Sequence, residues 1–186
     1  MTRKPEMFDP LPQGGQAPGA PAPSQWQPIL PAPADAPPPA TKHPKLGTPA
    51  REWPYLDPTG RLLGIVCRFD LASGGKEIRS LVYAMHPKYG REWRWLGFPK
   101  PRPLYGLDRL AARPKAPVVV TEGEKAADAA ALLLLDHVAV TSPGGSKAAK
   151  AADWSPLAGR HVVIWPDNDA PGQAYARDVI DMLAKL

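Results

Sequence analysis

The sequence predicts an α/β protein. A disordered proline-rich tail is followed by a small, basic, antiparallel β-rich domain and then by a Rossmann-like parallel βαβαβα domain. Three observations predict this order. More than half of the 26 prolines lie in residues 1–50, short β-type runs fill residues 51–98, and apolar runs alternate with helix-forming runs over residues 117–186. Proline-rich chain with few apolar residues cannot offset its ordering entropy, whereas alternating strand and helix patterns are typical of a parallel sheet.

The first segment, residues 1–50, contains runs such as PGAPAPS and PAPADAPPPA. We expect an extended, disordered tail that is either a plain spacer or a ligand for a proline-recognising groove. The N-terminus has no apolar signal region, and no apolar run approaches the roughly 18 residues of a membrane span. A single cysteine, Cys67, excludes an internal disulfide and a cysteine zinc clamp. These features predict a cytoplasmic protein without a membrane partner.

Three runs in the next segment predict antiparallel strands at residues 62–69, 77–85 and 92–98, separated by the turn signals ASGGK and HPKYG. Arginines stand among aromatic residues in and around these strands. This combination holds single-stranded nucleic acid in many proteins, by base stacking and phosphate neutralisation. The arginines that we expect to contact nucleic acid are Arg68, Arg79, Arg91 and Arg94. The alternative is structural, since such a sheet uses aromatic residues for its core and arginines for its solvent face.

The rest of the chain begins with a stiff connector at residues 99–116, which contains one short amphipathic helix in GLDRLAAR. Beyond it, buried parallel strands are predicted at VVVT (118–121), HVAVTS (137–142) and HVVIWP (161–166). Helix-forming runs lie at residues 124–135 and 172–186. Short connections between these elements predict a parallel sheet whose ligand site lies at the carboxyl ends of the strands.

Three carboxylates follow the predicted parallel strands. Glu122 comes directly after the first strand, and Asp167 and Asp169 follow the third. We expect them to converge at one edge of the sheet. Carboxylates gathered in a cleft repel one another, and a divalent cation such as Mg²⁺ relieves this repulsion. The alternative for an Asp-x-Asp pair at a strand end is a helix cap or a turn.

The distribution of charge supports a division of roles. Residues 1–116 carry 17 Lys and Arg against 9 Asp and Glu, whereas residues 117–186 carry 6 against 9. A basic front part suits a bound polyanion, and an acidic back part suits a cation site.

Two runs about 40 residues apart, VVVTEGEKAADAA and VVIWPDNDAPGQAYA, resemble the TOPRIM domain of DNA primases and primase-helicases of bacteria, phages and plasmids. The segment from Trp53 to Pro117 is similar to the region that precedes this domain in primase-like proteins of phages and integrated elements. The resemblance covers residues 53–186. It implies a nucleotidyltransferase that makes RNA primers on single-stranded DNA from nucleoside triphosphates, in the replication of a phage, plasmid or integrated element. It also implies a replicative helicase as a partner.

By position, the resemblance implies that Glu122 transfers a proton and that Glu122, Asp167 and Asp169 bind Mg²⁺ or Mn²⁺. Gly123 and Gly172 match the glycines at which the family's chain turns into a helix. Lys125, at the start of the first predicted helix of the parallel domain, is expected to meet a phosphate; its alternative is a solvated lysine.

The sequence departs from the family pattern in three respects. The family's domain continues with a further strand, so we expect the parallel domain to lack its last strand. Ala126 stands where many primases have an aspartate, and Asp128 follows two residues later. The sequence contains neither a zinc module nor a P-loop ATPase motif. These departures leave two further functions open: a non-catalytic nucleic-acid-binding remnant or subunit, and a TOPRIM nuclease.

Overall fold

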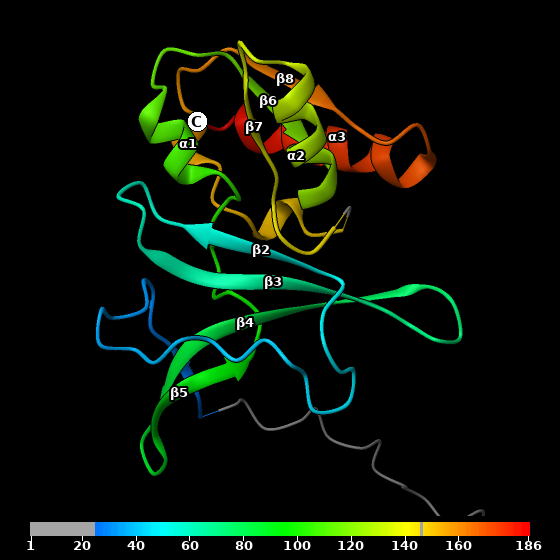
Figure 1. Ribbon diagram of the computed structural model, residues 1–186. Coiled ribbons are helices and arrows are strands. Elements are labelled where there is room, and N and C mark those ends of the chain that lie inside the picture. Colours follow the sequence, from blue (N-terminus) through cyan, green and yellow to red (C-terminus); the bar gives the residue numbers. More distant parts are fainter. Residues whose placement is uncertain (1–24, 146) are drawn as a thin grey trace, which may run out of the picture.

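The computed structural model describes residues 25–145 and 147–186, which form two β-sheets joined by a short helical segment (Figure 1). One sheet has five antiparallel strands in the order β1-β4-β3-β2, with β5 also paired to β4. The other has three parallel strands in the order β7-β6-β8. The predicted α/β class, with an antiparallel part followed by a parallel part, is confirmed. No helix among the described residues has the length and apolar character needed to cross a membrane.

The antiparallel sheet contains the three predicted strands and two further ones. Its strands are β1 (Gln27–Pro28), β2 (Arg51–Leu56), β3 (Leu62–Asp70), β4 (Lys76–His86) and β5 (Gly90–Trp95). The predicted strands correspond to β3, β4 and β5, although β5 ends at Trp95 rather than at residue 98. The strand β2 escaped prediction because it contains Pro54, which cannot donate a backbone hydrogen bond. The sheet accommodates this proline because β2 is an edge strand.

The N-terminal segment corrects the prediction of a disordered tail over residues 1–50, because residues 25–50 pack on the antiparallel sheet. The strand β1 pairs with β4, and the indole N–H of Trp93 donates a hydrogen bond of 2.6 Å to the carbonyl oxygen of Pro37. Proline-rich chain is already extended and has little conformational entropy to lose, so a few contacts with aromatic side chains suffice to hold it. The prediction for residues 1–24 lies outside the described residues.

The parallel part follows the predicted alternation of strands and helices. Its elements are β6 (Val118–Thr121), α2 (Glu124–Leu133), β7 (Val138–Val140), the 3-10 turns η1 (Ala149–Ala151) and η2 (Ser155–Leu157), β8 (Val162–Trp165) and α3 (Ala170–Leu183). The helix α2 packs on the face of the sheet that carries Val119 and Ala139. The helix α3 packs on the other face, with Val120 and Val140 (Figure 1). The central strand β6 is therefore buried on both sides, which explains its uninterrupted apolar sequence.

The two sheets share one hydrophobic core. Tyr55 of β2 belongs to the same buried cluster as Val120 of β6. The predicted connector also takes part, because its helix α1 (Leu107–Ala112) contributes Leu110 to this cluster. The antiparallel and parallel parts thus pack directly on one another, and the space between their facing surfaces is defined by both.

The turn between β2 and β3 is held by the carboxylate of Asp57. This carboxylate accepts hydrogen bonds from the backbone amide and hydroxyl of Thr59, at 2.8 and 2.7 Å. It also accepts them from the backbone amide and guanidinium of Arg61, at 3.0 and 2.8 Å. Desolvation alone would raise the pKa of Asp57, but these hydrogen bonds outweigh it and lower the pKa from 3.8 to about 2.

We expect the stability of the fold to depend on this carboxylate in acid. Because the pKa of Asp57 is lower in the folded chain than in the unfolded chain, its contribution is complete above pH 3.8 and is lost as the pH falls to about 2. Urea unfolding of Asp57→Asn over this range should therefore show a weaker pH dependence than that of the wild-type chain. The matched control is Asp136→Asn, at an exposed position. A wild-type pH profile in Asp57→Asn would contradict the assignment.

Candidate functional site

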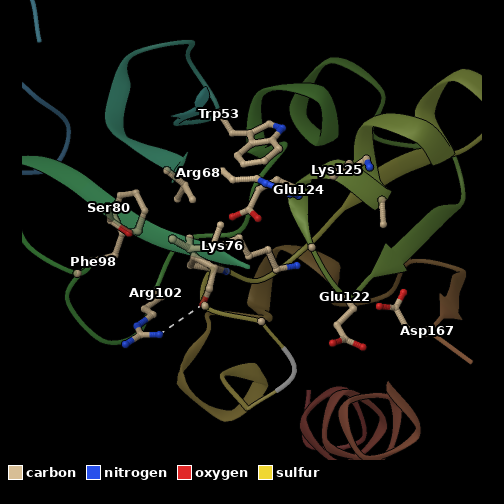
Figure 2. Close-up of a pocket in the computed structure, with 18 of the residues that line it drawn as sticks. Trp53, Arg68, Lys76, Ser80, Phe98, Arg102, Glu122, Glu124, Lys125 and Asp167 are labelled. Atoms are coloured by element: carbon tan, nitrogen blue, oxygen red, sulfur yellow. Dashed lines mark hydrogen bonds between the residues drawn. The ribbon is translucent and has the colours of Figure 1, made fainter. Parts of the chain in front are cut away.

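The carboxyl ends of β6 and β8 open into a pocket of about 640 Å³ between the two sheets (Figure 2). Glu122 follows β6 directly, and Asp167 follows β8 after one intervening residue. The two strands are parallel neighbours with Thr121 aligned to Trp165, so the residues that follow them lie side by side. Both carboxylates line the pocket and lie next to one another in Figure 2. The structure therefore brings together two of the three predicted carboxylates.

The third carboxylate, Asp169, is used differently. It is the N-cap of α3, and its Oδ1 accepts a hydrogen bond of 2.7 Å from the Gly172 amide. Aspartate is a preferred N-cap, and Pro171 in the first turn suits a helix start. The residues that line the pocket do not include Asp169. Among the described residues, no group of three or more His, Cys, Asp or Glu side chains is placed to hold a metal ion. The helix-cap alternative thus applies to Asp169.

The two motif glycines have different surroundings. A Cβ atom at Gly172 would overlap the carbonyl oxygen of Asp167 and would lie 2.9 Å from the amide nitrogen of Asp167. The first turn of α3 thus approaches the Asp167 backbone as only glycine permits. A Cβ atom at Gly123, the N-cap of α2, would meet no neighbouring atom of the described chain within 4 Å. Residue 172 must therefore be glycine because of its close approach to Asp167, whereas residue 123 has room for a larger side chain.

Four cationic side chains line the same pocket as the carboxylates. They are Arg68 of β3, Lys76 of β4, Arg102 of the connector and Lys125 of the first turn of α2. Part of this charge is already paired, because Arg68 forms an ion pair of 2.7 Å with Asp70. The guanidinium of Arg102 lies 3.4 Å from the carbonyl oxygen of Pro143, in the glycine-containing loop after β7 (Figure 2). Cations and carboxylates in one pocket suit a phosphate ligand that is bound together with a divalent cation.

The other arginines that were predicted to contact nucleic acid lie outside this pocket. The ion pairs that they form are Arg79 with Glu77, Arg91 with Asp35 and Arg94 with Glu92. The strand register places Arg79 and Arg91 on the face of the sheet opposite to Arg68, because successive residues of a strand point to opposite faces. Of the predicted nucleic-acid-binding residues, the pocket brings together only Arg68 and Lys125.

A further carboxylate in the pocket, Glu124, was not singled out from the sequence. It is 8% exposed, and its Oε1 accepts a hydrogen bond of 2.7 Å from the Tyr55 hydroxyl. Burial raises the pKa of Glu124. Its position two residues after Glu122 in TEGEK was the available signal. Lys76 and Arg102 gave no such signal, because only folding brings their segments to the parallel sheet.

The side chain of Asp128 holds α2 against the rest of the structure. Its Oδ2 accepts a hydrogen bond of 2.9 Å from the Trp53 indole, and its Oδ1 accepts one of 2.9 Å from the Tyr105 hydroxyl. Together with the hydrogen bond from Tyr55 to Glu124, these contacts fix the first two turns of α2. The wall of the pocket that carries Lys125 is thereby positioned.

The chemistry of the pocket follows from its donors. Mg²⁺ in proteins is held by one or two carboxylates, and water and substrate phosphates complete its coordination. The pair Glu122 and Asp167, which lines a pocket together with four cationic residues, fits this requirement. A comparison of the chain with protein-family models gives no match, and neither does a comparison with curated proteins.

Proposed function

We propose that the protein is a TOPRIM-type DNA primase, which joins nucleoside triphosphates into RNA primers on single-stranded DNA with Mg²⁺ or Mn²⁺ as cofactor. The observation that carries the proposal is the pocket between the sheets, which is lined by Glu122 and Asp167 and by four cationic residues. Primer synthesis needs both kinds of charge, because cations neutralise the triphosphate while carboxylates hold a metal ion and accept a proton. The resemblance of TEGEK and WPDNDAPG to the family's motifs supports the same assignment.

The residues of the pocket divide the reaction between them. Glu122 and Asp167 would hold the metal ion, which when bound stabilises the charge that develops on the phosphate. Glu122 accepts the proton of the primer 3′-hydroxyl as the hydroxyl oxygen bonds to the α-phosphorus and pyrophosphate departs. The cationic side chains bind the triphosphate and the template phosphates; they are Arg68, Lys76, Arg102 and Lys125. Asp169 keeps the loop that carries Asp167 in place by capping α3.

The resemblance also supplies the setting of the proposal. A protein of this kind acts in the replication of a phage, a plasmid or an integrated element, in the cytoplasm. Its partners are single-stranded DNA, nucleoside triphosphates and a replicative helicase. The similarity of the segment from Trp53 to Pro117 to primase-like proteins of such elements supports this setting.

A non-catalytic nucleic-acid-binding protein is the second candidate, and one observation favours it. Because Asp169 caps α3, the motif supplies two carboxylates to the pocket rather than three. A weaker metal site would leave a cationic pocket that binds a nucleic acid without chemistry. A TOPRIM nuclease would use the same carboxylates and differs in its product.

One assay separates these functions. The wild-type chain is incubated with circular single-stranded DNA, labelled ribonucleotides and Mg²⁺, and the products are resolved on a denaturing gel. The proposal predicts short RNA products that require both template and Mg²⁺ and that disappear when the metal is chelated. Template binding without product would overturn the primase proposal in favour of the non-catalytic protein. Breakage of the DNA circle would indicate the nuclease.

A further inference from the structure

Three aromatic rings form a cluster at the turn between β4 and β5, which we name the hairpin platform: Trp26, His86 and Tyr89. The rings of Trp26 and Tyr89 are close to parallel, with an interplanar angle of 17° and centroids 6.5 Å apart. The His86 ring lies 5.0 Å from Trp26 and 4.7 Å from Tyr89. His86 is buried, whereas Tyr89 is 65% exposed. The platform thus combines a buried histidine ring with an exposed tyrosine ring.

The turn itself is held in a defined conformation. His86 Nδ1 accepts hydrogen bonds from the backbone amides of Lys88 and Tyr89, at 3.0 and 3.3 Å. Gly90 closes the turn with a φ of +77°, in the left-handed region that favours glycine. Tyr89 is therefore presented on an ordered backbone, which lowers the entropy cost of binding to it.

Positive charge flanks the rings. The ammonium of Lys88 lies 5.3 Å from the centre of the Tyr89 ring, and the guanidinium of Arg94 lies 4.6 Å from that of Trp26. Arg94 shares its charge with Glu92, whereas Lys88 takes part in no ion pair among the described residues. Packing of the N-terminal segment explains the contact of Trp26 with His86, but it requires neither the exposure of Tyr89 nor the cation beside it.

We infer that the hairpin platform binds single-stranded nucleic acid, with a base stacked on the exposed ring of Tyr89 and its phosphates near Lys88 and Arg94. Aromatic rings alternating with cations are what a single strand requires, because every base has a stacking face and every linkage carries a negative charge. A partner protein with an apolar surface would offer no negative charge to Lys88 and Arg94, so the platform suits it less well.

The platform is separate from the pocket. The strand β4 begins with Lys76 in the pocket and ends with His86 in the platform, on the order of 30 Å away at about 3.3 Å per residue. Figure 1 shows the β4–β5 hairpin at the end of the antiparallel sheet remote from α2. By register, Arg94 is on the same side of the sheet as Arg68. A single nucleic-acid strand bound at the platform can therefore continue along that side of the sheet toward the pocket. The inference rests on the nucleic-acid part of the proposed function and not on catalysis.

The test is the affinity of the full chain for a labelled oligothymidylate of about 15 nucleotides, measured by fluorescence anisotropy without metal or nucleotide. Tyr89→Ala should weaken binding about tenfold, because one base loses its stacking partner. Tyr89→Phe keeps the ring and should bind as the wild-type chain does. Leu132→Ala, at a residue that is 79% exposed on α2, is the matched control and should have no effect.

Salt dependence gives a second readout. If Lys88 neutralises one phosphate, Lys88→Ala should reduce the slope of the logarithm of affinity against the logarithm of salt concentration by about 0.7. Wild-type affinity in Tyr89→Ala would overturn the inference. Equal losses in Tyr89→Phe and Tyr89→Ala would also overturn it, because the hydroxyl and not the ring would then matter.

The outcomes keep this inference apart from the proposed function. If the wild-type chain makes no primers but Tyr89→Ala weakens binding to the oligothymidylate, the platform is supported and the primase proposal is overturned. If the wild-type chain makes primers and Tyr89→Ala binds the oligothymidylate as tightly as the wild-type chain does, the primase proposal is supported and the platform is overturned. Thermal melting of each variant shows whether a loss of affinity reflects a loss of fold.

Discussion

Glu122→Gln should lower primer synthesis at least about 100-fold while leaving the fold and the affinity for single-stranded DNA unchanged. Glutamine has nearly the size of glutamate, but its amide cannot take up a proton and is a weaker ligand for Mg²⁺ than a carboxylate. Loss of a general base alone costs about 100-fold to 10,000-fold in rate. Initial rates of ribonucleotide incorporation measure the effect.

The matched control for this substitution is Glu52→Gln. Glu52 lies on β2, is exposed, accepts a hydrogen bond of 2.6 Å from the Thr41 hydroxyl and is not among the residues that line the pocket. Its substitution should leave the rate unchanged. Full activity in Glu122→Gln would show that Glu122 neither accepts the proton nor holds the metal ion. The proposed reaction site at the carboxyl ends of β6 and β8 would then be wrong.

Gly172→Ala should destabilise the fold by about 3 kcal/mol, the cost of overpacking a rigid site. Alanine in place of glycine within a helix ordinarily stabilises by about 1 kcal/mol, so the expected sign is opposite to the usual one. The reason is that the added Cβ would overlap the backbone of Asp167 at the start of α3. Urea unfolding measures the stability, and primer synthesis should fall as well because the Asp167 loop must move.

Gly123→Ala is the internal comparison for this prediction. Gly123 is also a motif glycine at a helix start, but it has an extended backbone and space for a methyl group. Its substitution should change the free energy of unfolding by less than about 1 kcal/mol. Equal effects of the two substitutions would show that the close approach of α3 to Asp167 does not require glycine at residue 172.

Much of the fold was predictable because hydrophobic periodicity is a local property. The uninterrupted run VVVT identified the central strand β6, and the regularly spaced β-type runs identified β3, β4 and β5. The strand β2 was missed because Pro54 interrupts its pattern, and the position of β2 at the sheet edge, which accommodates the proline, is a property of the whole sheet. The N-terminal segment was missed because composition does not reveal a few specific contacts, such as that of Trp93 with Pro37.

The site was predictable to the extent that topology fixes it. Strand ends of a parallel sheet meet at one edge, and this rule placed Glu122 and Asp167 without further information. The same rule does not separate a metal ligand from a helix cap, since both are aspartates after a strand, and Asp169 proved to be the cap. The face on which an arginine lies depends on strand register, so Arg68 and Arg79 could not be distinguished before the register was known.

If Glu122 and Asp167 form a divalent-cation site in the pocket, titration of the chain with Mg²⁺, followed by calorimetry, will detect it. We expect saturable binding by the wild-type chain and the loss of this binding in Asp167→Asn. Asp169→Asn should retain the binding, because asparagine caps a helix as well as aspartate does. Absence of saturable binding in a folded wild-type chain, or undiminished binding in Asp167→Asn, would show that these two carboxylates do not form a cation site.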